Sequence, residues 1–121
     1  MQHSPEFEQL VADAKTRVRE VTVAQWPDLA AAGAHLVDVR EDREWQAGHA
    51  VAAIHLGRGV LERDVVTTVP DKAAAIVLYC GGGFRSALAA DNLQKMGYRN
   101  VYSLAGGWKA WLAAGCATQN P

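Results

Sequence analysis

The sequence lacks the features of secreted, membrane-spanning and nucleic-acid-binding proteins. It has two cysteines in 121 residues, Cys80 and Cys116, which are too few for a disulfide framework. No apolar run approaches the length of about 20 residues that crosses a bilayer, and the first residues lack the basic and apolar segments of a signal peptide. Twelve basic residues against thirteen acidic ones leave a net charge of −1, so no basic surface favours nucleic acid or anionic lipid. These absences predict a soluble cytoplasmic protein without nucleic-acid or membrane partners.

Half of the residues are hydrophobic, enough for the core of one compact domain. Short apolar runs that predict strands alternate with segments that predict helices. The expected strands are 21–23, 35–39, 53–56, 76–79 and 101–104, and the expected helices are 26–32, 40–48, 86–96 and 107–112, with one helical turn at 60–63. This alternation predicts an α/β fold with a mostly parallel central sheet and helices on both faces.

A further helix is expected near the beginning of the chain. Ser4 followed by Pro5 resembles a helix start, and apolar residues then recur at helical spacing through Val18, so 5–19 is predicted to be amphipathic. Packing against the domain is the favoured role of this helix, and an oligomerisation surface is the alternative. The predicted organisation is an N-terminal helical segment over 1–19, a domain over 20–116 and a loose tail over 117–121.

One stretch combines the features of a nucleophile site. The strand expected at 76–79 ends at Cys80, passes three glycines and leads into the helix expected over 86–96. Consecutive glycines permit a tight loop with converging backbone N–H groups, and the helix adds the positive end of its dipole. Both effects lower the pKa of a thiol, so Cys80 is expected to be a thiolate near neutral pH. A cysteine alone is more often a small buried hydrophobe; here the order of strand, cysteine, glycine loop, Arg-Ser and helix favours chemistry.

Other polar residues could suggest a second catalytic cluster, namely Asp38, Arg40, Glu44 and His49. Arg40 and Glu44 are four positions apart, a spacing that lets them pair on one helical face. A structural role is favoured for all four. His49 and His55 have no cysteine or carboxylate pattern typical of a zinc site, so no metal is expected. Cys116, among small residues near the C-terminus, is given no role.

Three segments, in this order, resemble the rhodanese family. Leu36-Val37-Asp38-Val39-Arg40, followed by Glu44-Trp45 and Gly48-His49, is similar to the Asp-Val-Arg, Glu-aromatic and Gly-His motifs of that family. The segment 80–86 resembles its active-site loop, and 105–111 resembles its Gly-Gly-Trp signature. The resemblance covers residues from about 20 to 114 and implies the three-layer rhodanese-like fold for the domain.

The resemblance implies a single-domain sulfurtransferase that works by a ping-pong cycle without a cofactor. The Cys80 thiolate would take a sulfane sulfur from a donor such as thiosulfate and hold it as a persulfide. Cyanide or a cellular thiol, or an acceptor protein, would then remove the sulfur. The implied site is the nucleophile and the substrate-binding loop after it, that is Cys80, then Gly81, Gly82, Gly83, Phe84, Arg85 and Ser86.

The chain departs from the family pattern at two places that matter. Many rhodaneses read Gly-His-Ile-Pro-Gly-Ala, whereas this chain has Ala50, Val51 and Ala52 in place of Ile, Pro and Gly. Ala105 stands where an acidic residue often precedes Gly-Gly-Trp. The loop glycines also carry no cationic side chain that could hold thiosulfate.

Two other functions compete with sulfur transfer. Phosphatases and arsenate reductases of related fold also use a Cys…Arg loop, but related phosphatases place five residues between the two, whereas four lie between Cys80 and Arg85. The shorter loop favours one added sulfur over a phosphoryl group. A non-catalytic interaction module of the same fold is the third hypothesis, and the presence of Cys80 weighs against it.

Overall fold

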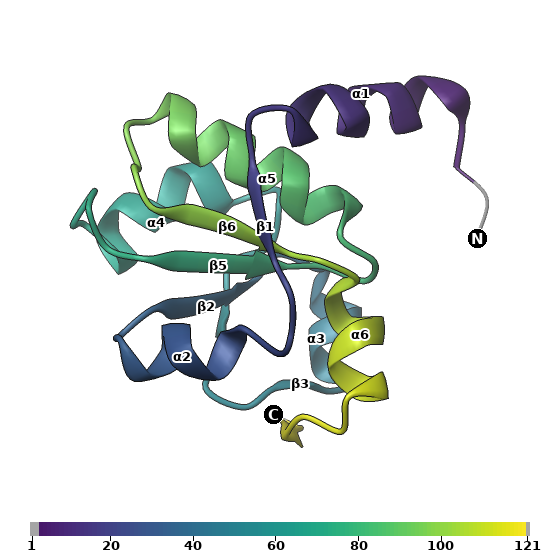
Figure 1. Cartoon of the computed structure of the whole chain (residues 1–121), viewed down its shortest axis with the longest axis vertical. Coiled ribbons are helices and arrows are strands. Elements are labelled where there is room, and N and C mark those ends of the chain that lie inside the picture. Colours follow the sequence, from purple (N-terminus) through teal and green to yellow (C-terminus); the bar gives the residue numbers. More distant parts are fainter. Residues whose placement is uncertain (1–2, 121) are drawn as a thin grey trace.

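The structure, a computed structural model, describes residues 3–120 and has the predicted α/β architecture (Figure 1). Its central sheet is parallel throughout, in the order β1-β6-β5-β2-β4. From one edge to the other these strands are Arg19–Val21, Val101–Leu104, Ile76–Tyr79, His35–Asp38 and Ile54–His55. A second sheet is an antiparallel pair of β3, His49–Ala50, and β7, Thr118–Gln119.

Helices cover both faces of the central sheet (Figure 1). They are α1 (Pro5–Lys15), α2 (Trp26–Ala31), α3 (Asp42–Gln46), α4 (Leu61–Thr68), α5 (Phe84–Lys95) and α6 (Gly107–Ala113). Helices α4 and α5 lie on one face with α1 packed outside α5, and α2 and α6 lie on the other. The predicted three-layer arrangement is confirmed.

Strand β5 is the centre of the core. Its four side chains have no exposed surface, and alternate residues point to opposite faces. Ile76 and Leu78 pack in the cluster that includes α4 and α5, while Val77 and Tyr79 pack in the cluster that includes α6. A parallel strand covered on both faces must be apolar on both, which explains why this stretch reads as an uninterrupted apolar run.

Several predicted segments differ from the structure, among them the strand expected at 21–23, which lies at 19–21. The helical turn expected at 60–63 is the two-turn helix α4, which buries Leu61 and Val65 against the sheet. Its β-branched residues have weak helix propensity, and packing of the buried stripe outweighs that preference. Helix α1 ends at Lys15, before the limit of 19 predicted for it, since Arg19–Val21 pairs with β6.

The predicted loose tail is wrong for residues 117–120. There β7 pairs with β3, the Trp111 indole N–H donates to the Ala117 carbonyl at 2.9 Å, and the Val51 N–H donates to the same oxygen at 3.1 Å. Both strands are two residues long and have no alternating pattern, so only their proximity in the fold reveals the pairing. Residues 1, 2 and 121, the outer ends of the predicted terminal segments, lie outside the described residues.

Ala52 adopts a conformation that favours glycine. Its φ is +69°, and the Ala53 N–H donates to the Ala50 carbonyl at 3.2 Å, the pattern of a type II turn with Ala52 at the third position. This position holds glycine in the rhodanese pattern. We expect Ala52→Gly to stabilise the protein by about 1 kcal/mol, because an L side chain is strained in the left-handed region. Thermal unfolding should show a rise in Tm of about 4 °C.

The matched control for that change is Ala53→Gly, next to it in the same turn but without a positive φ. There glycine relieves no strain and adds freedom to the unfolded chain, so Tm should fall. If both variants shifted Tm in the same direction, strain at Ala52 would not be the cause.

Candidate active site

Cys80 lies at the carboxyl end of β5, directly before the loop that leads into α5. Parallel sheets of this kind place ligands at this edge, where strand ends meet helix N-termini. The Cys80 side chain is 1% exposed and belongs to the buried cluster beneath α5. The strand therefore fixes the position of the thiol, and the loop supplies the groups that surround the sulfur.

The loop directs backbone N–H donors at the Cys80 sulfur, and the Ser86 hydroxyl oxygen accepts a hydrogen bond from the thiol. The Gly83 N–H lies 3.1 Å from Sγ and the Ser86 N–H 3.4 Å, while the Ser86 Oγ is 3.5 Å away. Gly83 has a φ of +99°, so the turn that aims its N–H inward needs a residue without a side chain. Burial raises the pKa of the thiol, but hydrogen bonds from Ser86, Gly83 and Gly82 outweigh burial, and the pKa of Cys80 lies below its ordinary value.

The Gly-Gly-Trp segment forms the other support of this loop. The Trp108 N–H donates to the Cys80 carbonyl at 2.7 Å, and the Lys109 N–H donates to the Gly81 carbonyl at 3.2 Å. A side chain on Gly107 would place its Cβ 2.3 Å from the Cys80 carbonyl oxygen. Glycine at this position is thus a requirement of the close contact between the first turn of α6 and the loop.

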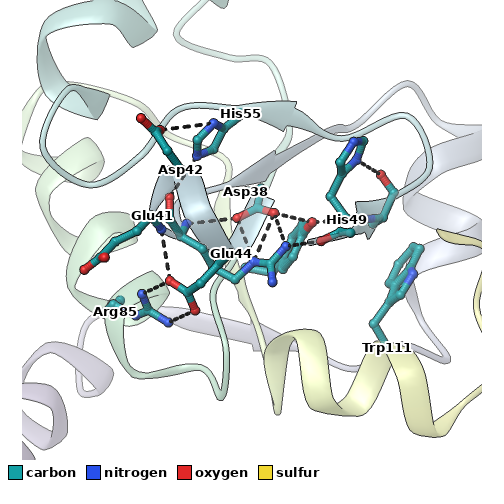
Figure 2. A network of polar contacts seen from close by, with 12 residues as sticks. Asp38, Glu41, Asp42, Glu44, His49, His55, Arg85 and Trp111 are labelled. Atoms are coloured by element: carbon teal, nitrogen blue, oxygen red, sulfur yellow. Dashed lines mark hydrogen bonds and ion pairs between the residues drawn. The ribbon is translucent and has the colours of Figure 1, made fainter. Parts of the chain in front are cut away.

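Arg85 is held by Glu44 of α3 (Figure 2). Its two terminal nitrogens lie 2.8 and 3.1 Å from the two carboxylate oxygens, a bidentate pair, and Glu44 also accepts the Glu41 N–H at 3.0 Å. The hydrogen bonds from Arg85 lower the pKa of Glu44 to about 2 despite partial burial. The suggested pairing of Glu44 with Arg40 is wrong, because Arg40 precedes α3 and faces Asp38 instead.

Asp38, at the end of β2 (Figure 2), forms a buried ion pair with Arg40. The Arg40 guanidinium lies 2.8 Å from the Asp38 carboxylate and also donates to the Gly48 carbonyl at 2.7 Å. The Tyr79 hydroxyl donates to Asp38 at 2.6 Å and accepts the Ala50 N–H at 3.1 Å. Burial and the hydrogen bond to Asp38 raise the pKa of Tyr79. This network ties β2, β3 and β5 together and stands apart from the thiol.

Two histidines stack on Trp45, and within residues 3–120 neither forms a hydrogen bond with the Cys80 sulfur. His49 lies parallel to the indole with ring centroids 3.4 Å apart, and His55 lies parallel to it at 4.8 Å. His49 Nδ1 hydrogen-bonds the Ala50 carbonyl, and His55 Nε2 hydrogen-bonds the Arg40 carbonyl. Among residues 3–120, no group of three or more metal-ligating side chains is arranged to hold an ion.

Helix α1 contacts the loop through Phe84. The rings of His3 and Phe7 lie 4.7 and 5.9 Å from the Phe84 ring, centroid to centroid. A cleft of about 650 Å³ opens beside Arg85. It is lined by Val39, Arg40, Glu41, Asp42, Arg43, His55, Gly57, Arg58, Gly59, Val60 and Arg85. The loop segment thus contacts the N-terminal helix through Phe84 and borders the cleft through Arg85.

Of the residues predicted for the site, Gly82, Gly83 and Ser86 direct N–H groups at the Cys80 sulfur, and Gly81 completes the loop. Phe84 and Arg85 make their side-chain contacts with α1 and α3. The sequence predicts a structural role for Glu44 but not its contact with Arg85, and it does not single out Ser103. Ser103 is fully buried in β6 with its Oγ 2.8 Å from the Ser86 Oγ. The sequence feature that could have indicated Ser103 is a serine within an otherwise apolar predicted strand.

Comparison with known proteins finds a match to the rhodanese-like domain family over residues 23–114. Thiosulfate sulfurtransferase PspE of Escherichia coli is 36% identical over 78 residues, which are 64% of this chain and 74% of PspE. Across the most similar curated relatives, the matched stretch spans 60 to 74% of their length.

Two solved structures are similar over nearly the whole chain. A protein of unknown function from Rhodopseudomonas palustris, described as a possible tyrosine phosphatase, has a TM-score of 0.86 at 28% identity and covers 98% of both chains. The polysulfide-sulfur transferase homodimer of Wolinella succinogenes has a TM-score of 0.81 at 26% identity, covering 96% of this chain and 88% of its own. No helix within residues 3–120 has the length and apolar character needed to cross a membrane.

Proposed function

The chain belongs to the rhodanese-like domain family, and from this we propose that it is a sulfurtransferase that carries a sulfane sulfur on Cys80. The observation that carries the proposal is the position of the Cys80 sulfur, buried at a strand end with two backbone N–H groups and one hydroxyl within 3.5 Å. PspE, a relative by sequence, is named a thiosulfate sulfurtransferase, and the Wolinella neighbour a polysulfide-sulfur transferase. We assign the chemistry to residues 20–116, with α1 as a separate N-terminal element.

The proposed cycle has two displacements at sulfur. The Cys80 thiolate attacks the outer sulfur of thiosulfate, the sulfur–sulfur bond of the donor breaks, and sulfite leaves with the electron pair. The enzyme then holds a persulfide anion. Cyanide or a thiolate attacks its outer sulfur, and the Cys80 thiolate leaves with the electron pair of the bond that breaks. Each step exchanges one bond to sulfur for another, so no oxidant, reductant or cofactor is needed.

The hydrogen-bond donors of the loop would stabilise both the thiolate and the persulfide form of Cys80. Gly83 and Ser86 stabilise negative charge on the cysteine sulfur, and the loop of Gly81 to Ser86 is the proposed binding site for the transferred sulfur. Preorganised donors of this kind lower the barrier because they need no reorientation as charge develops. Gly81, Gly82 and Gly83 carry no side chain, so these three positions offer no cationic group to the donor.

We further propose that the donor is a small anion and that the acceptor is cyanide, a low-molecular-weight thiol or a thiol on an acceptor protein. Arg58 lines the cleft beside the loop and presents positive charge to a sulfonate or carboxylate. Arg85 is already paired with Glu44, so its main contribution is to brace the loop. Arg58 also supports the loop, by donating to the Arg85 carbonyl at 3.2 Å.

A phosphatase is the second candidate, favoured by the description of the Rhodopseudomonas neighbour. Phosphoryl transfer requires a ring of N–H donors around three equatorial oxygens. Four residues separate Cys80 from Arg85, one fewer than in the related phosphatases, and the Arg85 guanidinium is occupied by Glu44 rather than free to hold an anion. Both features favour sulfur over phosphorus.

Incubation with thiosulfate is expected to raise the intact mass of the protein by one sulfur atom, and cyanide should remove it. Hydrolysis of p-nitrophenyl phosphate should be negligible, because the loop is too short to surround a phosphoryl group. Intact-mass spectrometry and a colorimetric phosphatase assay measure the two outcomes. The matched variant inserts one glycine after Gly83, which should lengthen the loop and reduce sulfur loading. A wild-type protein that hydrolyses aryl phosphates well and never gains sulfur would overturn the proposal.

A further inference from the structure

The thiol of Cys80 is the first member of a buried chain of three hydrogen-bonding side chains. Its sulfur lies 3.5 Å from the Ser86 Oγ, which in turn lies 2.8 Å from the Ser103 Oγ. Ser103 lies on β6 opposite Leu78 of β5, and both serines are without exposed surface. The Ser103 hydroxyl thus reaches the nucleophile through Ser86, although 23 positions separate it from Cys80 in the sequence.

The number of hydrogens in this chain differs between the two forms of the cysteine. Within residues 3–120, the Ser86 and Ser103 hydroxyls have no hydrogen-bond partners other than each other and the Cys80 sulfur. Two hydrogen bonds connect these three side chains, Cys80 to Ser86 and Ser86 to Ser103, and each hydrogen bond uses one hydrogen. The thiol form carries three hydrogens, one on sulfur and one on each serine, so one buried donor is left without an acceptor. An unpaired buried donor is costly.

In the thiolate form every hydrogen of the chain has an acceptor. The thiol donates to the Ser86 Oγ, and this bond reverses when the thiol loses its proton. Ser103 then donates to the Ser86 Oγ, and Ser86 donates to the sulfur anion, so two hydrogens fill the two hydrogen bonds. A hydroxyl that itself accepts a hydrogen bond is polarised and becomes a better donor. Both effects act in the same direction, toward loss of the proton from Cys80.

We propose that Ser103 is a positioning residue for sulfur transfer, which orients the Ser86 hydroxyl so that its hydrogen points at the Cys80 sulfur. The importance of Ser103 for sulfur transfer rests on the proposed function. Its effect on the pKa of the Cys80 thiol can be measured without any sulfur donor. Ser103 does not touch the reacting atoms, and it acts through Ser86 alone.

The charged groups around Cys80 do not depend on Ser103. Arg85 on α5 is paired with Glu44 on α3, and Asp38 and Arg40 pair with each other at the end of β2. Lys109 on α6 is exposed and contacts the loop through its backbone N–H. Removal of the Ser103 hydroxyl therefore changes no ion pair near the sulfur, and a change in thiol titration would report on the hydroxyl chain.

The test is the pH dependence of iodoacetamide alkylation of Cys80, in a Cys116→Ser background and without any donor. Ser103→Ala is expected to raise the midpoint by roughly 0.5 to 1 pH unit, since one polarising hydrogen bond is lost. Ser86→Ala should raise it further. Ser103→Thr keeps the hydroxyl and should restore a midpoint close to that of wild type. The matched control is Tyr102→Phe, which removes a hydroxyl from the adjacent position of β6.

The double variant Ser86→Ala with Ser103→Ala decides whether the two serines form one chain. If Ser103 acts only through Ser86, its loss should have no further effect once Ser86 is alanine. An unchanged midpoint in Ser103→Ala, or an equal shift in both backgrounds, would overturn the inference. Thermal unfolding of each variant verifies that the fold is retained. Failure of thiosulfate to load sulfur on wild type would overturn the proposed function and leave the alkylation result standing.

Discussion

Cys80→Ser is expected to abolish sulfur transfer, with a loss of at least about 10³-fold in thiosulfate:cyanide turnover. The serine hydroxyl would occupy the same position near the Gly83 and Ser86 N–H groups, but an alcohol is not ionised at neutral pH and cannot hold a labile sulfur. The mass increase after incubation with thiosulfate should vanish together with the activity. Because the change is nearly isosteric, the thermal unfolding midpoint should stay close to that of wild type.

Cys116→Ser is the matched control for this loss. Cys116 is partly exposed in the short segment after α6 and contacts the apolar cluster on the opposite face from α5. Turnover and sulfur loading should stay near the wild-type values. Equal losses in the two variants would contradict the assignment of Cys80 as the nucleophile.

Asp38→Asn is expected to cause the largest loss of stability among single substitutions considered for this fold, about 3–5 kcal/mol in the free energy of unfolding. The Asp38 carboxylate has no exposed surface and is the ion-pair partner of Arg40, which is itself 3% exposed. The asparagine amide cannot neutralise the guanidinium, which would be left as an unpaired buried charge. It would also weaken the acceptor of the Tyr79 hydroxyl. Urea unfolding followed by circular dichroism measures the change.

Asp42→Asn is the matched control, since it makes the same chemical change on an aspartate whose side chain is 97% exposed. Its nearest basic partner is His55 Nδ1 at 3.8 Å, and exposed pairs of this kind contribute little. The free energy of unfolding should change by no more than about 0.5 kcal/mol. Similar losses at the two positions would mean that burial of the Asp38–Arg40 pair is not what makes this site sensitive.

Local sequence was sufficient to predict the structure wherever the residues that determine a segment's conformation lie within that segment. The apolar run before Cys80 requires a strand buried on both faces, and the three glycines after it permit the turn that aims the Gly83 N–H at the sulfur. The strand, the loop and the beginning of α5 are contiguous, so their order alone indicated Cys80 as the candidate nucleophile. The family resemblance rested on three such contiguous motifs and correctly predicted the fold.

Sequence was insufficient to predict those features that depend on contacts between segments far apart in the chain. Glu44 is 41 positions from its partner Arg85, and the spacing of four from Arg40 suggested the wrong pair. The polar residues of β7 show no strand pattern, and they pair with β3 only because α6 returns the chain to that edge.

The sequence by itself thus determined the fold, the strand that ends at Cys80 and the loop that follows it, because propensity, apolar periodicity and glycine conformation act over a few adjacent residues. The tertiary structure alone decided what braces Arg85, which carboxylate holds Arg40, and that Ser103 reaches the sulfur through Ser86. Those contacts depend on strand order and on the side from which each helix packs. These are properties of the whole chain, because the free energy of burial is shared among all segments that meet in the core.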